Sequence, residues 1–478
     1  MPTIGITAVQ VCNPHRMELP SWLLLRIVKT TGYMMRLSAT FFGSMLLLGS
    51  MLLEAPSASA QNYTWTGAVS SDWNTAGNWS PNGVPSYPAT INFGSVARTN
   101  ISISASSNSA GGMTFGTNAP AYTLSISAAP GVYPTLNLYD STSNQSTTAR
   151  PTFVVATQAS LGLRGIISGI AIDNSSSVLL SGSQVSLSNS SIVNQNGGMI
   201  NYAVGDGLST ESSSIVNDLG ASIDISDDFG NFVATIGSLS GAGNVYLGSH
   251  ALALGAMSSN DTISGVIADG GSVVGSGGTL TKIGYGTLLL TGANTYTGQT
   301  TVQSGKLQVD GSLASPSVLV DSGAVIAGAG TIGDLLAQAN SVIIPGNANA
   351  DCKLSAGRLQ CANSPIVQER IGNISGVTHG TYLLLSQPLN TGFCPDLYFR
   401  FLSAGVPLAV GESYLLAIIQ GSTNYSSSNI NFDFSAFPGY HQATGTIFVG
   451  SLGSISTIDL QLTSIGDEIF GSGFEITN

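Results

Sequence analysis

The chain has 478 residues, of which 59 are glycine, 43% are hydrophobic and only 8% are charged, and its net charge is −12. So few charges exclude a protein coated with surface helices, and the apolar content excludes a chain that stays disordered. The negative charge excludes nucleic acid and anionic membranes as partners, because like charges repel. The composition therefore predicts short strands and tight turns.

Residues 1–60 have the features of a secretory signal peptide. A basic residue precedes the apolar run FFGSMLLLGSMLL, and Ala58 and Ala60 form an A-x-A cleavage pattern before Gln61. We expect residues 1–33 to come from a translation start assigned too far upstream. A transmembrane anchor is the alternative, but the run is shorter than the roughly 20 residues that span a bilayer. Cleavage removes four basic and two acidic side chains, so the mature chain carries −14 and is not an integral membrane protein.

The next segment, residues 61–94, contains Trp65, Trp73 and Trp79, three of the four tryptophans. Aromatic side chains can cover the first turn of a solenoid, whose bare edge would otherwise pair with another chain. We interpret the segment as an N-terminal aromatic cap. A carbohydrate-binding platform of exposed aromatic faces is the alternative.

Short apolar alternations separated by Gly, Asn, Ser and Asp fill the residues that follow, for example at 178–180 and 222–225. Each alternation predicts a brief strand that ends in a turn. Strands this short do not make separate hairpin domains, but coiled into successive turns they bury one continuous aliphatic column. Low charge suits such stacking, since like charges opposite each other in a ladder repel. We predict an all-β fold with a parallel β-helix over residues 95–350.

The most regular stretch, residues 278–309, reads GTLTKIGYGTLLLTGANTYTGQTTVQSGKLQV. Leucines and valines supply the strand positions, and glycines interrupt them where a positive φ or close packing is needed. Asn294 is expected in a turn, where its side chain can satisfy local backbone groups. Lys282 and Lys306 are expected at exposed strand positions.

This stretch resembles the autotransporter-associated β-strand repeat, also called the passenger-associated transport repeat. The matching positions include Gly284, Gly286, Gly292, Asn294, Tyr296, Gly298 and Gly305. The resemblance is strong over residues 235–350 and general over 61–234. It implies a right-handed parallel β-helix passenger, exported to the cell surface, the medium or the periplasm of a Gram-negative bacterium. Family members classically end in a translocating barrel, for which we see too little sequence after the repeat, so we expect a separate export machine.

Residues 351–463 differ in character, because their strands are longer and more aromatic. They predict a small C-terminal antiparallel β cap or domain. The tail, residues 464–478, resembles a D-x-I-F-x-x-G-F-E ending that recurs on secreted proteins of some Gram-negative bacteria, which implies sorting or anchoring. A last strand packed on the cap is the alternative.

Three cysteines remain after the leader, in an oxidising compartment where one disulfide is expected. Cys352 and Cys361 bracket a short segment that would form a hairpin, which favours their pairing and leaves Cys394 odd. Pairing of Cys361 with Cys394 stays open. No histidine or further cysteine has ligand-like spacing beside them, so no metal site or cofactor is expected.

Parallel β-helices include lyases and glycosidases that act on acidic polysaccharides, so catalytic carboxylates need a test. The candidates are Asp224, Asp227 and Asp228. As strand neighbours the last two would point to opposite faces, and no basic residue or histidine is close in sequence. We expect a solvated turn there.

A serine-protease site is the other catalytic arrangement to consider, because some passengers carry a G-D-S-G nucleophile segment. Here Asp321, Ser322 and Gly323 lack the leading glycine. The mature histidines, His250, His379 and His441, stand in no recognisable base context. No catalytic residue is therefore assigned.

The sequence thus favours an exported structural or adhesin-like passenger without catalysis. Its repeated Ser, Thr and Asn side chains would make weak multivalent contacts with host, matrix or polysaccharide surfaces. A β-helix carbohydrate-active enzyme, either a polysaccharide lyase or a glycosidase with an unrecognised site, is the alternative. A passive envelope component without a ligand is the third.

Overall fold

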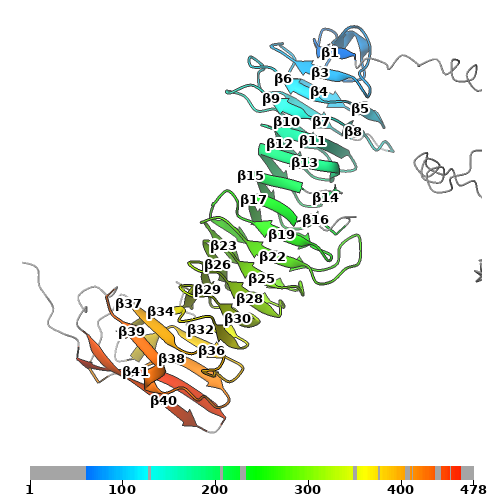
Figure 1. Ribbon diagram of the computed structural model, residues 1–478. Coiled ribbons are helices and arrows are strands. Elements are labelled where there is room, and N and C mark those ends of the chain that lie inside the picture. The colour runs from blue at the N-terminus through cyan, green and yellow to red at the C-terminus, as the bar shows by residue number, and fades with distance from the viewer. Residues whose placement is uncertain are drawn as a thin grey trace, which may run out of the picture. The chain divides into compact units, whose positions relative to one another are not determined.

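The computed structural model describes residues 61–127, 131–204, 208–226, 233–347, 353–374, 377–403, 410–411, 413–435, 443–452 and 454–464. Two 3-10 turns, η1 (Ala76–Asn78) and η2 (Ser427–Asn429), are the helical elements in these ranges, and the other elements are strands. Most strands pair in parallel with one strand earlier and one later in the chain. The chain is a parallel β-helix, as predicted (Figure 1).

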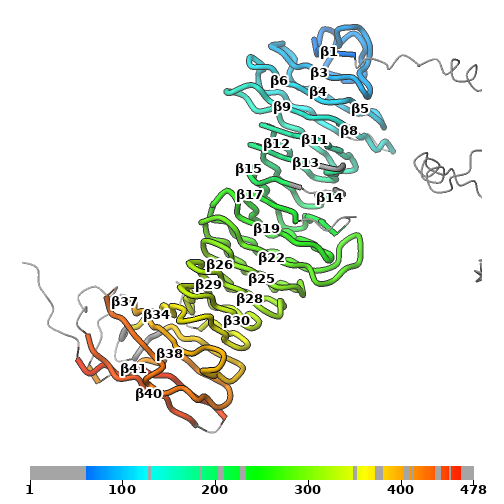
Figure 2. Tube along the Cα trace, in the orientation of Figure 1, coloured from blue at the N-terminus to red at the C-terminus, as the bar shows by residue number. Residues whose placement is uncertain are grey.

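The chain winds in stacked turns (Figure 2). The strand pairing arranges them in three columns that form three faces, and each turn visits face 3, then face 1, then face 2. Face 1 consists of β1 (Asn62–Trp65), β3 (Thr90–Phe93), β6 (Met113–Phe115), β9 (Thr142–Asn144), β11 (Ser160–Ser168), β13 (Ser177–Asn194), β15 (Leu208–Asn217), β17 (Val233–Gly241), β19 (Ala251–Leu254), β22 (Thr279–Lys282), β25 (Thr300–Val302), β28 (Ser317–Val320), β30 (Asp334–Ala337) and β33 (Leu359–Cys361). The long strands β11, β13, β15 and β17 turn a corner and so belong to more than one face.

The other two faces are built in the same way. Face 2 consists of β4 (Asn100–Ile103), β7 (Thr123–Ile126), β10 (Thr152–Val155), β12 (Ala171–Asn174), the last parts of β13, β15 and β17, β20 (Asp261–Ile263), β23 (Thr287–Leu290), β26 (Lys306–Val309), β29 (Val325–Gly328), β31 (Val342–Pro345), β34 (Ile366–Ile374), β37 (Leu397–Ser403) and β39 (Ile430–Asp433). Face 3 consists of β5 (Asn108–Ala110), β8 (Thr135–Leu138), the first parts of β11 and β13, β14 (Met199–Val204), β16 (Ser222–Asp224), β18 (Asn244–Tyr246), β21 (Ile267–Ala268), β24 (Ala293–Asn294), β27 (Ser312–Leu313), β32 (Lys353–Ala356), β36 (Tyr382–Leu385) and β38 (Ser413–Gln420).

The core is a column of aliphatic side chains that point inward from all three faces. On face 2 the ladder places Leu288 beside Leu307, Leu307 beside Ile326, and Ile326 beside Ile343. All four are at most 2% exposed. Burial of each such side chain contributes about 1.5–3 kcal/mol, which is how strands of two to four residues become stable. The predicted aliphatic column is confirmed.

One corner is held by a ladder of buried asparagines. The Asn174 Nδ2 donates to Asn194 Oδ1 at 2.8 Å, and Asn194 Nδ2 donates to Asn217 Oδ1 at 2.8 Å. Each amide also donates to a backbone carbonyl, that of Met199 or Ser222. Neutral amides can donate and accept at the same time, so they stack where charged side chains would repel.

Glycines occupy the corner between faces 2 and 3, because backbones of successive turns nearly touch there. A Cβ on Gly292 would lie 2.2 Å from the carbonyl oxygen of Gly265, and one on Gly311 would lie 2.1 Å from that of Gly292. Gly330 repeats the contact with the oxygen of Gly311, also at 2.1 Å. Gly292 of the repeat is therefore required for close approach of the backbones.

The N-terminal end of the described chain is filled by aromatic rings. Trp65, Trp73 and Trp79 are at most 3% exposed, and the ring of Trp79 meets the other two edge to face at 4.9 and 4.8 Å. The short β2 (Trp79–Ser80) pairs antiparallel with β1. These indoles cannot be the exposed carbohydrate platform that the sequence left open, because their faces are inside.

Parallel stacking continues beyond residue 350, where the sequence predicted an antiparallel region to begin. On face 2 the ladder runs on through β34, β37 and β39, with Phe399 and Phe401 pointing inward. Among the described residues after 350, antiparallel pairing is limited to β35 (Val377–Gly380) on β34, and to β41 (Ile455–Ser464) and β40 (Thr444–Leu452), which extend from β38. Longer aromatic strands still stack because they keep the alternation of inward and outward residues.

Several sequence predictions fall on residues outside the described ranges. The leader with its cleavage residues Ala58 and Ala60 lies there, and so do residues 465–478 of the tail. Gln61, the expected first mature residue, opens the described chain and is exposed. None of the helices in the described part has the length and hydropathy needed to cross a bilayer.

Candidate functional site

Asp224, a candidate catalytic carboxylate, serves the fold. Its Oδ1 accepts the backbone N–H of Ser226 at 2.9 Å, and its Oδ2 accepts that of Ser272 at 2.7 Å. The side chain is 4% exposed, so the solvated turn expected here is wrong for Asp224. It is buried because it ties the loop after β21 to the end of β16. Asp227 and Asp228 lie outside the described residues.

The protease-like segment is not joined to a base. Ser322 lies in the turn after β28, whereas His250 precedes β19. Three ladder steps separate β19 from β28, which is about 14 Å at the usual strand spacing. His250 is therefore out of hydrogen-bond reach of Ser322. His379 belongs to β35, and His441 lies outside the described part of the chain.

Lys282 is buried, contrary to the exposed position that the sequence predicted. It is 1% exposed, and its ammonium donates to the carbonyl oxygens of Ile283 at 2.5 Å, Gly284 at 2.8 Å and Ser304 at 3.4 Å. Burial lowers its pKa to about 8, and the Asp261 carboxylate opposes this shift. The aliphatic stem fills an inward position while the charged end satisfies carbonyls of two successive turns.

The polar residues of the repeat also hold turns together. The Asn294 Oδ1 accepts the N–H of Ile267 at 3.0 Å, and its Nδ2 donates to the carbonyl of Ser312 at 3.2 Å. Asn294 thus bridges the turns before and after its own, beyond the local role predicted. The Tyr296 hydroxyl is buried 2.7 Å from Thr300 Oγ1. The repeat is a set of structural contacts between turns.

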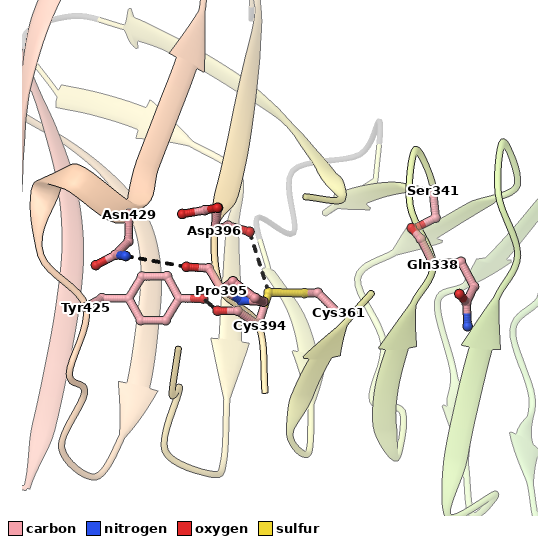
Figure 3. Close-up of a disulfide and its surroundings, with 8 residues drawn as sticks. All are labelled: Gln338, Ser341, Cys361, Cys394, Pro395, Asp396, Tyr425 and Asn429. Carbon is pink, nitrogen blue, oxygen red and sulfur yellow. Dashed lines mark hydrogen bonds between the residues drawn. A yellow bond between two sulfur atoms is a disulfide. The ribbon is translucent and has the colours of Figure 1, made fainter. Parts of the chain in front are cut away.

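A disulfide joins two consecutive turns at the end of face 1 (Figure 3). Cys361 ends β33 and bonds to Cys394, with the Cα atoms 4.4 Å apart. The Cys352–Cys361 pairing favoured by the sequence is therefore wrong, and the pairing left open is the one formed. The segment that the sequence predicted to be a hairpin turns a corner from β32 on face 3 to β33 on face 1, and these two strands do not pair with each other. Cys352 itself lies outside the described residues.

Two neighbouring hollows, here together called the Lys306 groove, lie at the corner between faces 1 and 2 and on face 2. Lys306 lines both of them. The corner hollow has a volume of ≈ 490 Å³ and is lined by Tyr285, Gln303, Ser304, Gly305, Lys306, Ser322, Gly323, Ala324 and Val325. The face hollow has a volume of ≈ 180 Å³ and is lined by Lys306, Gln308, Ala327, Ile344, Pro345, Gly346, Asn347, Gln368, Arg370 and Thr381.

The groove carries positive charge that its lining does not neutralise. Within the described ranges, no acidic side chain pairs with Lys306 or with the Arg370 guanidinium. The nearest carboxylate along the strand, Asp310, accepts a hydrogen bond from Gln308 Nε2 at 3.0 Å. Lys306 is partly exposed, and Tyr285 at the corner is 87% exposed. Sequence reasoning missed this site because Lys306 and Arg370 are far apart in the chain, and only the ladder brings them to one face.

No group of His, Cys, Asp and Glu in the described ranges is arranged to hold a metal ion. The Lys306 groove is lined by cations, amides, hydroxyls and a tyrosine, which suit recognition of an anionic, hydroxyl-rich ligand. It has no carboxylate pair and no histidine among its lining residues. Binding is the chemistry that this arrangement can perform.

Comparison with known proteins agrees with the stacked turns. The family model of the passenger-associated-transport-repeat matches residues 280–309, which run from β22 to β26. The chain contains a passenger-associated-transport repeat at these residues. An extracellular serine protease of Serratia marcescens is 45% identical over 75 residues, 16% of this chain and 7% of that protein. The adhesin BmaC autotransporter of Brucella suis biovar 1 (strain 1330) is 33% identical over 114 residues, 23% of this chain and 3% of the adhesin.

The passenger-repeat protein thus spans less than a tenth of either relative's length, at 7% and 3%. Within the match lie Gly292, Lys282 and Asn294, so the family pattern coincides with contacts between turns. The repeat places the protein among the exported, surface-exposed or secreted proteins of Gram-negative bacteria.

Proposed function

We propose that this passenger-repeat protein is an adhesive surface scaffold without catalytic activity. The observation that carries the proposal is the open, cationic Lys306 groove on the outer face of a fold that is held together by one hydrophobic core. A relative that contains a similar segment is named an adhesin, which supports the same reading.

The use of reactive side chains supports a role without catalysis. The side chains of Asp224, Lys282 and Asn294 form hydrogen bonds with backbone groups. Each is buried, so none is presented to a substrate. Catalysis needs groups that converge on one reacting atom, and these residues are instead buried against backbone groups, Asp224 under the loop after β21 and Lys282 and Asn294 at inward positions.

The scaffold would act through many weak contacts. Outward Ser, Thr and Asn side chains recur on successive turns about 4.8 Å apart, which offers a regular row of hydroxyl and amide groups. Weak contacts that are linked on one rigid body combine into strong attachment, because each later contact is intramolecular. A rigid array is suited to an extended surface and less to a small molecule.

The test is adhesion of the mature chain, residues 61–478, coated on beads. We expect retention on at least one of three surfaces: cultured cells, matrix protein films and polysaccharide films. Beads coated with an unrelated acidic protein serve as the control. Inertness on all three surfaces would contradict the adhesive role, and release of product from a polysaccharide panel would favour the rival enzyme.

A further inference from the structure

We propose that the Lys306 groove binds an anionic linear polysaccharide. The inference rests on the proposed adhesive function and names the class of ligand for it. The groove is a track of two hollows that both border Lys306, one at the corner with Tyr285 and the other on face 2 with Arg370.

The charge of the groove indicates an anionic ligand. Lys306 and Arg370 line it, and neither pairs with an acidic side chain in the described part of the chain. The whole protein carries a net charge of −12, so a polyanion is repelled over most of the surface. An anion is therefore attracted only where cations are concentrated and left free, and charge-assisted hydrogen bonds to them are about twice as strong as neutral ones.

The remaining polar lining indicates a ligand rich in hydroxyl groups. Gln308 and Gln368 contribute amides from β26 and β34, while Ser304 and Ser322 contribute hydroxyls from the corner. An amide both donates and accepts hydrogen bonds, which matches a sugar hydroxyl. Between them the floor is made of small or aliphatic side chains such as Ala327.

Tyr285 supplies an aromatic surface at one end of the track. Its side chain is 87% exposed, although the aromatic ring is large and apolar on both of its sides. The flanking glycines fix the corner, because a Cβ on Gly284 or on Gly286 would lie 2.0 Å from a carbonyl oxygen of the preceding turn. The ring is thus held out by a rigid backbone, ready to cover the C–H face of a sugar ring.

The length of the track favours a polymer over a small molecule. Its lining residues come from the turn before β23 and from β26, β29, β31 and β34, which follow one another in the ladder. Four ladder steps correspond to about 19 Å. Nucleic acid fits less well, since tracking a phosphate backbone requires more cations than two.

The experiment is isothermal titration calorimetry of the mature chain with three glycans of matched length. These are oligogalacturonate, which carries carboxylates, dextran sulfate, which carries sulfates, and uncharged dextran. We expect binding of at least one anionic glycan and none of dextran. The glycan that binds identifies the anionic group that the groove recognises. Added salt should weaken the binding, because exposed charges are screened.

Variants locate the site. Lys306→Ala with Arg370→Ala should weaken binding at least tenfold, and Tyr285→Ala should weaken it severalfold. The matched control is Arg164→Ala with Lys353→Ala, which removes the same charge from exposed positions outside the groove and should leave the affinity unchanged. Circular dichroism of each variant checks that the fold is intact.

The result that would overturn the proposal is equal weakening by both double variants, equal binding of dextran, or no binding of either anionic glycan. Bead adhesion measured on the same groove variant separates the two proposals. If the chain adheres as strongly with Lys306 and Arg370 replaced as without, the groove assignment fails and the adhesive function stands. If the unaltered chain adheres to nothing, the adhesive function itself fails.

Discussion

Glu369 is an ionisable group sealed in the core, and it should make the stability of the β-helix depend on pH. It points inward from β34 between Val367 and Ile371, is 0% exposed, and faces Phe401 on the next turn. Neither of its carboxyl oxygens has a hydrogen-bond partner. Burial without compensation raises its pKa well above the ordinary value of 4.5.

The sign and size of the effect follow from proton linkage. Above pH 4.5 the unfolded chain releases this proton while the folded chain keeps it, so stability falls as the pH rises. The full stability is present below the unfolded pKa and is lost progressively up to the folded pKa. Each pH unit in that window lowers the free energy of unfolding by about 1.4 kcal/mol. Ordinary domains have a stability of about 5–15 kcal/mol, so the effect is measurable.

The perturbation is Glu369→Gln, which keeps the shape of the side chain and removes its titration. Urea unfolding is measured for both proteins between pH 4.5 and 8. The free energy of unfolding of the variant should rise relative to that of the parent by about 1.4 kcal/mol per pH unit between the unfolded and the folded pKa of Glu369. Glu211→Gln, at an exposed position of β15, is the control and should follow the parent. If the stability of Glu369→Gln and that of the parent changed in parallel with pH, the raised pKa of Glu369 would be contradicted, because the carboxyl would then ionise equally in the folded and unfolded states.

The remaining predictions concern contacts between turns and are read from urea or thermal unfolding. Gly292→Ala should cost about 3 kcal/mol because its Cβ meets a carbonyl at 2.2 Å, whereas Gly94→Ala, with open space around it, should cost little; equal losses would contradict the close approach. Lys282→Ala should cost about 3 kcal/mol, since it removes a buried stem and leaves carbonyls without a donor; an unchanged midpoint would argue against the buried ammonium. Replacing Cys361 and Cys394 with Ser should lower the free energy of unfolding by about 4 kcal/mol, because the disulfide no longer constrains the loop between them. The parent protein in reducing buffer should lose the same amount, and a smaller loss there would show that the substitutions act in another way.

The class of fold, the inward positions of the core and the glycines between the strands could be predicted from the amino-acid sequence. Alternation of apolar and polar residues predicts strands with one buried side, and strands too short to stand alone must coil on one another. The inward positions Leu288 and Leu307 could be read in this way, and so could the need for a glycine at Gly292. These features are local, because they depend on the period of the strand and on the conformation of the turn.

Which residues of different turns become neighbours depends on how the turns stack, and this could not be predicted from the sequence. Turns differ in length, so Leu288 pairs with Asp261 on one side and Leu307 on the other across unequal stretches of chain. The ladder register therefore cannot be counted from the sequence. It is this register that buries Lys282 against the next turn, joins Cys361 to Cys394, and sets Lys306 and Arg370 along one groove.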